Sequence, residues 1–193
     1  MPIFWRSSRN RIAALFVLLA FASAAPAARA ADDALSPAAN AAFLAANAAK
    51  PGTITRPSGL QYRVLRSGTG GRAGGNDLLR VSYTVRMING AMVDQTNPAL
   101  PQTISQTTIG MAGLAEALSL MHVGDRWQLA LPANLALGAK GAANNAVPPN
   151  QTLLFDLTLI SASPPAPGQV AADNPFSVWG NGRENGAAFT IHP

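Results

Sequence analysis

The chain of 193 residues contains no cysteine, and it is also poor in histidine, aromatic residues and charge. Without cysteine the protein has no disulfide framework, no thiol chemistry and no site for a lipid-modified cysteine. With only two histidines, His122 and His192, neither a histidine-based metal cluster nor a Ser-His-Asp triad is expected. The fold must therefore depend on an apolar core, which a hydrophobic content of 48% can supply.

The formal net charge of +5 suggests a nucleic-acid-binding protein, but the distribution of charge along the chain argues against one. Four of the fourteen basic residues, Arg6, Arg9, Arg11 and Arg29, fall within the first thirty positions. The remaining ten face nine acidic residues, and no basic stripe alternates with aromatic residues. A nucleic-acid partner is therefore not expected.

Residues 1–30 have the pattern of a secretory signal peptide. A basic start is followed by an apolar run from Ile12 to about Ala25, and Ala28 and Ala30 provide a small-residue cleavage site. The apolar run is too short to span a bilayer comfortably, and an uncleaved membrane anchor is the alternative. We expect cleavage before Ala31, a periplasmic or secreted protein, and no stable membrane insertion afterwards.

Two further segments flank the expected domain. Residues 31–57 predict a short Ala-rich helix and a linker, in which Ser36 is the N-cap, Pro37 lies in the first turn and Pro51-Gly52 ends the helix. Residues 163–193 are rich in Pro, Gly and Asn and predict a flexible C-terminal tail. One domain over residues 58–162 remains between them.

Residues 58–162 have the period-two alternation of β-strands, interrupted by one amphipathic helix. Strands are expected at 59–65, 80–87, 91–94, near 104, at 126–131 and at 153–160, and Asn89-Gly90 predicts a tight hairpin turn. Leu114, Leu118 and Met121 follow helical spacing, and Gly124 is expected to cap that helix in a left-handed conformation. The pattern predicts an α+β fold in which one helix lies on a β-sheet.

A set of short motifs then occurs in a fixed order. The motifs are Ser58-Gly-Leu-Gln-Tyr62, Asn89-Gly90 with Asp94, the helix from Glu116 to Gly124, Leu131-Pro132, Leu135-Ala-Leu-Gly138, Pro148-Pro-Asn150 and Leu153-Leu-Phe-Asp-Leu157. In this order and spacing the chain resembles the FKBP-type peptidyl-prolyl cis-trans isomerases, in the exported bacterial branch related to the macrophage infectivity potentiators. The resemblance runs from about Ala42 to Ser161, and it implies a curved antiparallel β-sheet wrapped around one central α-helix.

The resemblance implies a proline-binding pocket without metal or organic cofactor. Asp94 and Tyr83 take the positions of its catalytic polar groups. The other positions implied to bind substrate are Val93, Gln102, Met111, Leu114, Leu137, Val147 and Phe155. Several of these depart from the family: a tryptophan is usual at Leu114, a tyrosine at Leu137, aromatic residues at Val93 and Gln102, and a β-branched residue that donates a backbone contact at Met111.

The implied activity is the acceleration of X-Pro bond rotation in proline-containing, folding polypeptides. Rotation has a barrier of ~18–20 kcal/mol, and a pocket that removes water and binds the twisted imide more tightly than the planar one lowers it without a covalent step. The replaced aromatic residues favour weak turnover and leave an alternative, a catalytically weak or inactive FKBP-like chaperone or binding module. Because the Ala-rich helix lacks a long stalk, a monomer is expected.

Overall fold

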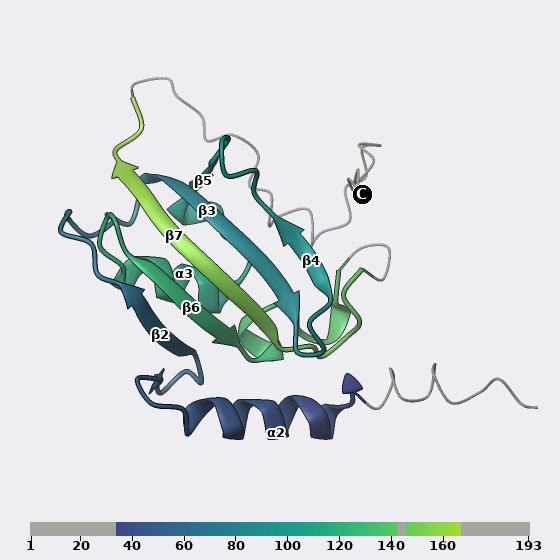
Figure 1. Ribbon diagram of the computed structural model, residues 1–193. Coiled ribbons are helices and arrows are strands. Elements are labelled where there is room, and N and C mark those ends of the chain that lie inside the picture. Colours follow the sequence, from purple (N-terminus) through teal and green to yellow (C-terminus); the bar gives the residue numbers. More distant parts are fainter. Residues whose placement is uncertain (1–33, 143–145, 167–193) are drawn as a thin grey trace, which may run out of the picture.

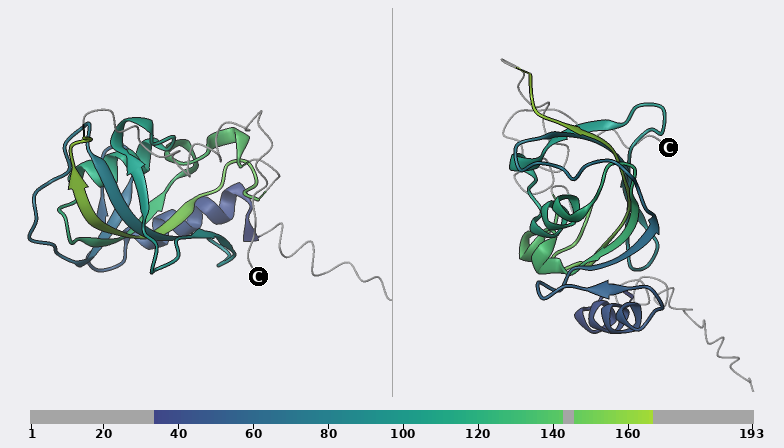
Figure 2. Two further views of the ribbon diagram at one scale, coloured as in Figure 1. Left: turned by 90° about the horizontal axis from the view of Figure 1, so that it is seen from above. Right: turned by 90° about the vertical axis from the view of Figure 1, so that its left-hand side faces the viewer.

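The computed structural model describes residues 34–142 and 146–166. These form one antiparallel sheet that curves around a helix, with a second helix at one end of the sheet (Figures 1 and 2). The strands are β1 (Ile54–Thr55), β2 (Gln61–Arg66), β3 (Leu78–Met87), β4 (Met92–Gln95), β5 (Gln102–Ser105), β6 (Arg126–Leu131) and β7 (Leu153–Ser163). The expected α+β class is confirmed.

The sheet has the order β1-β2-β6-β7-β3-β4, and β5 pairs with β3 beyond this path. In β3 the side chains of Val81, Tyr83, Val85 and Met87 are buried, whereas the residues between them are exposed or half-buried. This alternation is the one expected of a strand with one face on a core. The near-continuous apolar strand β7 lies between β6 and β3, as its sequence predicts for a central strand.

Helix α3 (Ala112–Leu120) lies on the concave side of the sheet (Figure 2), and its apolar residues Leu114, Ala117 and Leu118 are completely buried. A glycine at position 113 permits this close packing, because a Cβ there would lie 2.7 Å from Leu131 Cδ2 and 2.9 Å from Leu135 Cβ. The prediction for Gly124 was wrong in one respect. It has a φ of 97°, but the helix ends at Leu120 with Met121 as its C-cap. Gly124 belongs to a separate turn, in which Asp125 N–H donates to His122 C=O.

Helix α2 (Pro37–Ala48) confirms the predicted N-terminal helix, and the Ser36 side chain accepts a hydrogen bond from Ala39 N–H at its start. It contacts the end of the sheet where β2 and β7 begin (Figure 1), and its contact is polar as well as apolar. Asn40 is buried and bonds to Gln151 and Thr152, just before β7. The helix is thus attached to the sheet by specific side-chain contacts.

The segments between the strands contain a tight turn and short 3₁₀ helices. Gly90, with φ of 86°, donates to Met87 C=O in the β3–β4 hairpin that Asn89-Gly90 predicts. The long segment after β6 contains two short 3₁₀ helices, η2 (Ala133–Leu135) and η3 (Gly138–Lys140), and another, η1 (Gln106–Thr108), follows β5. Strand β7 continues to Ser163, three residues beyond the predicted end of the strand.

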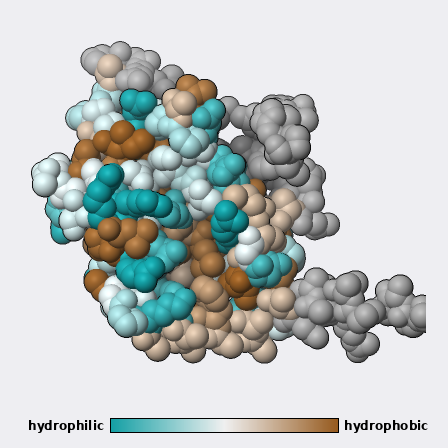
Figure 3. Space-filling view, in the orientation of Figure 1, coloured by the Kyte–Doolittle hydropathy of each residue, from teal (hydrophilic) through white to brown (hydrophobic). Residues whose placement is uncertain are grey.

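Some expectations lie outside the described residues: the signal peptide 1–30, nearly all of the tail 163–193, and His192. None of the helices formed by residues 34–142 and 146–166 is long and apolar enough to cross a membrane. On the outer face of the sheet, hydrophobic patches alternate with hydrophilic residues (Figure 3).

Candidate functional site

The hairpin of β3 and β4 brings Tyr83 and Asp94 together. The Tyr83 hydroxyl donates to Asp94 Oδ2 at 2.9 Å, and the backbone N–H of Gln95 donates to Asp94 Oδ1 at 2.7 Å. Tyr83 is buried and Asp94 is half-buried, so the carboxylate lies at the border between core and solvent. Both carboxylate oxygens are therefore oriented by donors from the protein.

Thr96 holds this pair in register. Its hydroxyl accepts the backbone N–H of Tyr83 at 3.0 Å, and its own N–H donates to Tyr83 C=O at 2.9 Å. The residue is almost completely buried and also bonds to Ser82 Oγ at 3.0 Å. Sequence reasoning missed Thr96, because a threonine two residues after an acid has no distinctive pattern before its partner strand is known.

Burial shifts the pKa of both groups. It raises the pKa of Tyr83 far above its ordinary value, and the neighbouring Asp94 carboxylate raises it further. Burial also raises the pKa of Asp94, while the hydrogen bonds from Tyr83 and Gln95 act in the opposite direction. Tyr83 consequently remains a hydrogen-bond donor at every physiological pH.

An apolar cluster adjoins this pair within the core. Met111, Leu114, Val147 and Phe155 are at most 1% exposed, and all belong to the same cluster as Tyr83. They come from the N-cap position and first turn of α3, from the loop before β7, and from β7 itself. The structure therefore brings five of the nine implied site residues into one packed group.

The other implied residues lie around or away from this cluster. Val93 in β4 and Leu137 at the start of η3 are partly buried and pack against it, and Asp94 bonds to Tyr83. Gln102 is exposed on β5, opposite Val81 in the register. Val93, Asp94 and Leu137 are thus the partly exposed members of the implied set beside the buried cluster.

Part of the loop after β6 is held in place by backbone bonds. Asn150 N–H donates to Gly138 C=O at 2.8 Å, and Ala142 N–H donates to Val147 C=O at 2.9 Å. Gly138 and Gly141 have positive φ angles of 61° and 65°, which glycine adopts without strain. These bonds fix Val147 in the core beside the candidate site.

The described residues contain no group of three or more histidine, aspartate or glutamate side chains that could hold a metal ion. The site consists instead of one carboxylate, one phenol and aliphatic or aromatic walls. Such a set can bind an apolar ring and orient a polar group next to it.

Comparison with known proteins defines the class of this domain. The family model "FKBP-type peptidyl-prolyl cis-trans isomerase" matches residues 70–160, and the model "Domain amino terminal to FKBP-type peptidyl-prolyl isomerase" matches residues 10–64. A solved peptidyl-prolyl cis-trans isomerase from Pseudomonas syringae pv. tomato superposes with a TM-score of 0.61 at 32% identity, over 68% of this chain and 95% of that one. The chain belongs to the FKBP-type peptidyl-prolyl cis-trans isomerase family.

Within that family its relatives include macrophage infectivity potentiators. The outer membrane protein MIP of Legionella longbeachae is 41% identical over 120 residues, which are 62% of this chain and 51% of the relative. The macrophage infectivity potentiator of Trypanosoma cruzi is 35% identical over 132 residues, 68% of this chain and 67% of the relative. The chain spans about half the length of several curated relatives that it matches.

Proposed function

We propose that this protein accelerates cis-trans rotation of X-Pro bonds in polypeptides. The observation that carries the proposal is the Tyr83–Asp94 hydrogen bond of 2.9 Å beside the apolar cluster of Met111, Leu114 and Phe155. Membership of the family supports the same activity. No cofactor is needed for such a rotation, because no bond is broken.

The chemistry follows from differential binding. A planar imide is stabilised by resonance and by water on its carbonyl, and both are weakened when the bond twists. A prolyl ring against Val93 and Leu137 would lose water, and an oriented carboxylate at Asp94 would face the twisted imide. Each 1.36 kcal/mol by which the twisted form is bound better than the planar form gives a tenfold acceleration.

A backbone donor supplies a second polar contact. Met111 occupies the N-cap position of α3, and no backbone acceptor pairs with its N–H within residues 34–142 and 146–166. The family usually has a residue with a backbone donor at this position, and we expect the Met111 N–H to make the same contact with a substrate carbonyl. Together with Asp94 it would orient the peptide at both sides of the proline.

The aliphatic side chain of Leu114 should lower the rate of isomerisation. This side chain is completely buried in the apolar cluster, and an aliphatic residue at this position leaves the candidate site without an indole ring. Contact area is worth about 25 cal/mol per Å², so a missing aromatic surface of some tens of Å² costs about 1 kcal/mol of binding. We expect slow catalysis, and a binding module with little turnover is the second candidate function.

A protease-coupled assay on tetrapeptides that vary the residue before proline tests the proposal. Micromolar protein should raise the isomerisation rate above the uncatalysed rate in at least part of the set. No acceleration, together with retained suppression of aggregation of an unfolded test protein, would refute catalysis and favour the binding module.

We further propose that the protein acts as an exported monomer. A relative carries the name "outer membrane protein", which supports export, as does the sequence of residues 1–30. N-terminal sequencing of the protein recovered from the cell envelope should begin at Ala31, and light scattering should give the mass of one chain.

A further inference from the structure

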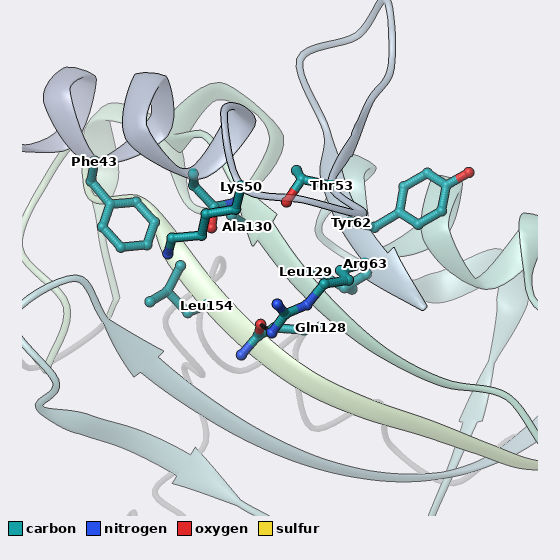
Figure 4. Close-up of a pocket in the computed structure, with 10 residues that line it drawn as sticks. Phe43, Lys50, Thr53, Tyr62, Arg63, Gln128, Leu129, Ala130 and Leu154 are labelled. Atoms are coloured by element: carbon teal, nitrogen blue, oxygen red, sulfur yellow. Dashed lines mark hydrogen bonds between the residues drawn. The ribbon is translucent and has the colours of Figure 1, made fainter. Parts of the chain in front are cut away.

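A cleft lies between helix α2 and the sheet, lined by residues of both (Figure 4). Its volume is about 170 Å³. Its lining includes three apolar or aromatic residues, Phe43, Leu154 and Ala130, and two basic residues, Lys50 and Arg63. We call this site the α2 cleft. The remaining lining residues are Asn47, Thr53, Tyr62, Gln128 and Leu129.

Strand alternation places the cleft on the outer face. Leu129 and Phe155 point into the core, so their neighbours Gln128 and Leu154 point to the opposite side of the sheet. Arg63 pairs with Gln128 in the register of β2 and β6, and its Nη2 donates to Gln128 Oε1 at 2.8 Å. The cleft is therefore distinct from the candidate proline site, which lies on the concave side.

The cleft presents positive charge without a matching carboxylate. Lys50 and Arg63 are the charged residues among those that line it. The ammonium of Lys50 lies 5.4 Å from the centroid of the Phe43 ring, so an aromatic face and a cation adjoin at the helix side (Figure 4). Asp156, which pairs with Gln128 in the register of β6 and β7, already accepts two hydrogen bonds from Arg126, at 2.8 and 2.7 Å.

The cleft is preformed, because α2 is attached to the sheet on either side of Phe43. Asn40 bonds to Gln151 and Thr152, and Asn47 Nδ2 donates to Gln61 Oε1 at 2.9 Å. A cavity of about 150 Å³ holds a benzene-sized group. The α2 cleft therefore has room for one leucine or phenylalanine side chain.

We propose that the α2 cleft binds an extended polypeptide through one apolar side chain and a neighbouring acidic side chain. The apolar side chain packs on Phe43 and Leu154, and the carboxylate lies between Lys50 and Arg63. The proposal rests on the proposed function in one respect, that the partner is a polypeptide client. The protein would then hold acidic clients at the α2 cleft while their prolines reach the other face of the sheet.

The test uses the full chain and two fluorescein-labelled, proline-free dodecamers, one with three Leu-Glu pairs and one with three Leu-Gln pairs. Fluorescence anisotropy should give at least tenfold tighter binding for the acidic peptide, and Lys50→Glu or Arg63→Glu should each reduce that affinity at least tenfold. Arg80→Glu is the matched control, because Arg80 is exposed on β3 and does not line the cleft. It should change the affinity less than twofold.

Amide chemical shifts of Phe43, Gln128 and Leu154 should move on titration of the acidic peptide. Equal binding of both peptides, or equal losses for Arg63→Glu and Arg80→Glu, would overturn the proposal, since binding would then follow overall charge. The tetrapeptide isomerase rate separates the two proposals. An inactive protein that still binds the acidic peptide at the cleft refutes the proposed function alone, and an active protein without cleft binding refutes this inference alone.

Discussion

Replacement of Asn40 by alanine tests how α2 is held, and the structure sets the size of the effect. The Asn40 side chain is 6% exposed. Its Nδ2 contacts Gln151 Oε1 at 3.1 Å, and its Oδ1 accepts the Thr152 N–H at 2.8 Å. Two bonds to Leu35 and Ser36 carbonyls complete its environment.

The Asn40→Ala substitution would leave the Thr152 N–H without a partner in a residue that is 1% exposed. An unsatisfied buried group costs about 1–3 kcal/mol, and the lost bond to Gln151 costs a further ~0.5–1.5 kcal/mol. The higher helix propensity of alanine returns up to about 0.7 kcal/mol. The expected net loss in the free energy of unfolding is about 2–3 kcal/mol.

Urea denaturation of the variant measures this loss, and hydrogen exchange at Thr152 should accelerate with it. Asn47→Ala is the control, because Asn47 makes one side-chain bond, to Gln61, and should cost ~0.5–1.5 kcal/mol. A loss at Asn40 below about 0.5 kcal/mol, or equal to that of the control, would refute the argument that this asparagine fastens α2 to the sheet.

Three further predictions concern the candidate site. Tyr83→Phe removes the hydrogen bond to Asp94 and should lower kcat/KM about two- to tenfold. Because that bond lowers the pKa of Asp94, an NMR titration of the variant should find this pKa raised further. An unchanged pKa would show that the bond does not exist in solution. Burial raises the pKa of Asp94, so the protonated carboxyl stabilises the folded state below the ordinary pKa of 3.8. This stabilisation is lost as pH rises through the raised pKa. The melting temperature of Asp94→Asn should therefore rise relative to the parent between about pH 3 and pH 7, and a constant difference contradicts this. Leu114→Trp should raise kcat/KM about fivefold, since about 40 Å² of added contact gives ~1 kcal/mol of binding. Overpacking should lower the free energy of unfolding by about 1–3 kcal/mol. A folded variant with unchanged kcat/KM would show that the proline does not bind beside residue 114.

The candidate site could be anticipated only in part from the sequence. The family resemblance implied Tyr83, Asp94 and Phe155 as site residues, and the structure joins the first two by a hydrogen bond. The same reasoning gave no account of Thr96, whose hydroxyl holds the two strands together. It also implied that Gln102 and Val93 both bind substrate, although Gln102 is exposed on β5, which pairs with β3 off the main strand order.

The sequence by itself determined the local elements. Alternation in β3, the Asn89-Gly90 turn and the Ser36-Pro37 helix start depend on steric and hydrogen-bond preferences within a few residues, and each is found where it was expected. The end of α3 is the exception. Gly124 has the conformation that its type favours, but it serves a turn whose partner bonds come from β7, through Leu159.

Only the tertiary structure decided which distant residues meet. Asn40 and Gln151 are 111 positions apart, and the cleft between Phe43 and Leu154 exists because their elements pack together. Such contacts depend on the order and register of all the strands, and a one-residue shift of β7 would turn Leu154 inward and Phe155 outward. The alternation of each strand is thus local information, whereas the α2 cleft and the Tyr83–Asp94 pair arise from the way the strands are assembled.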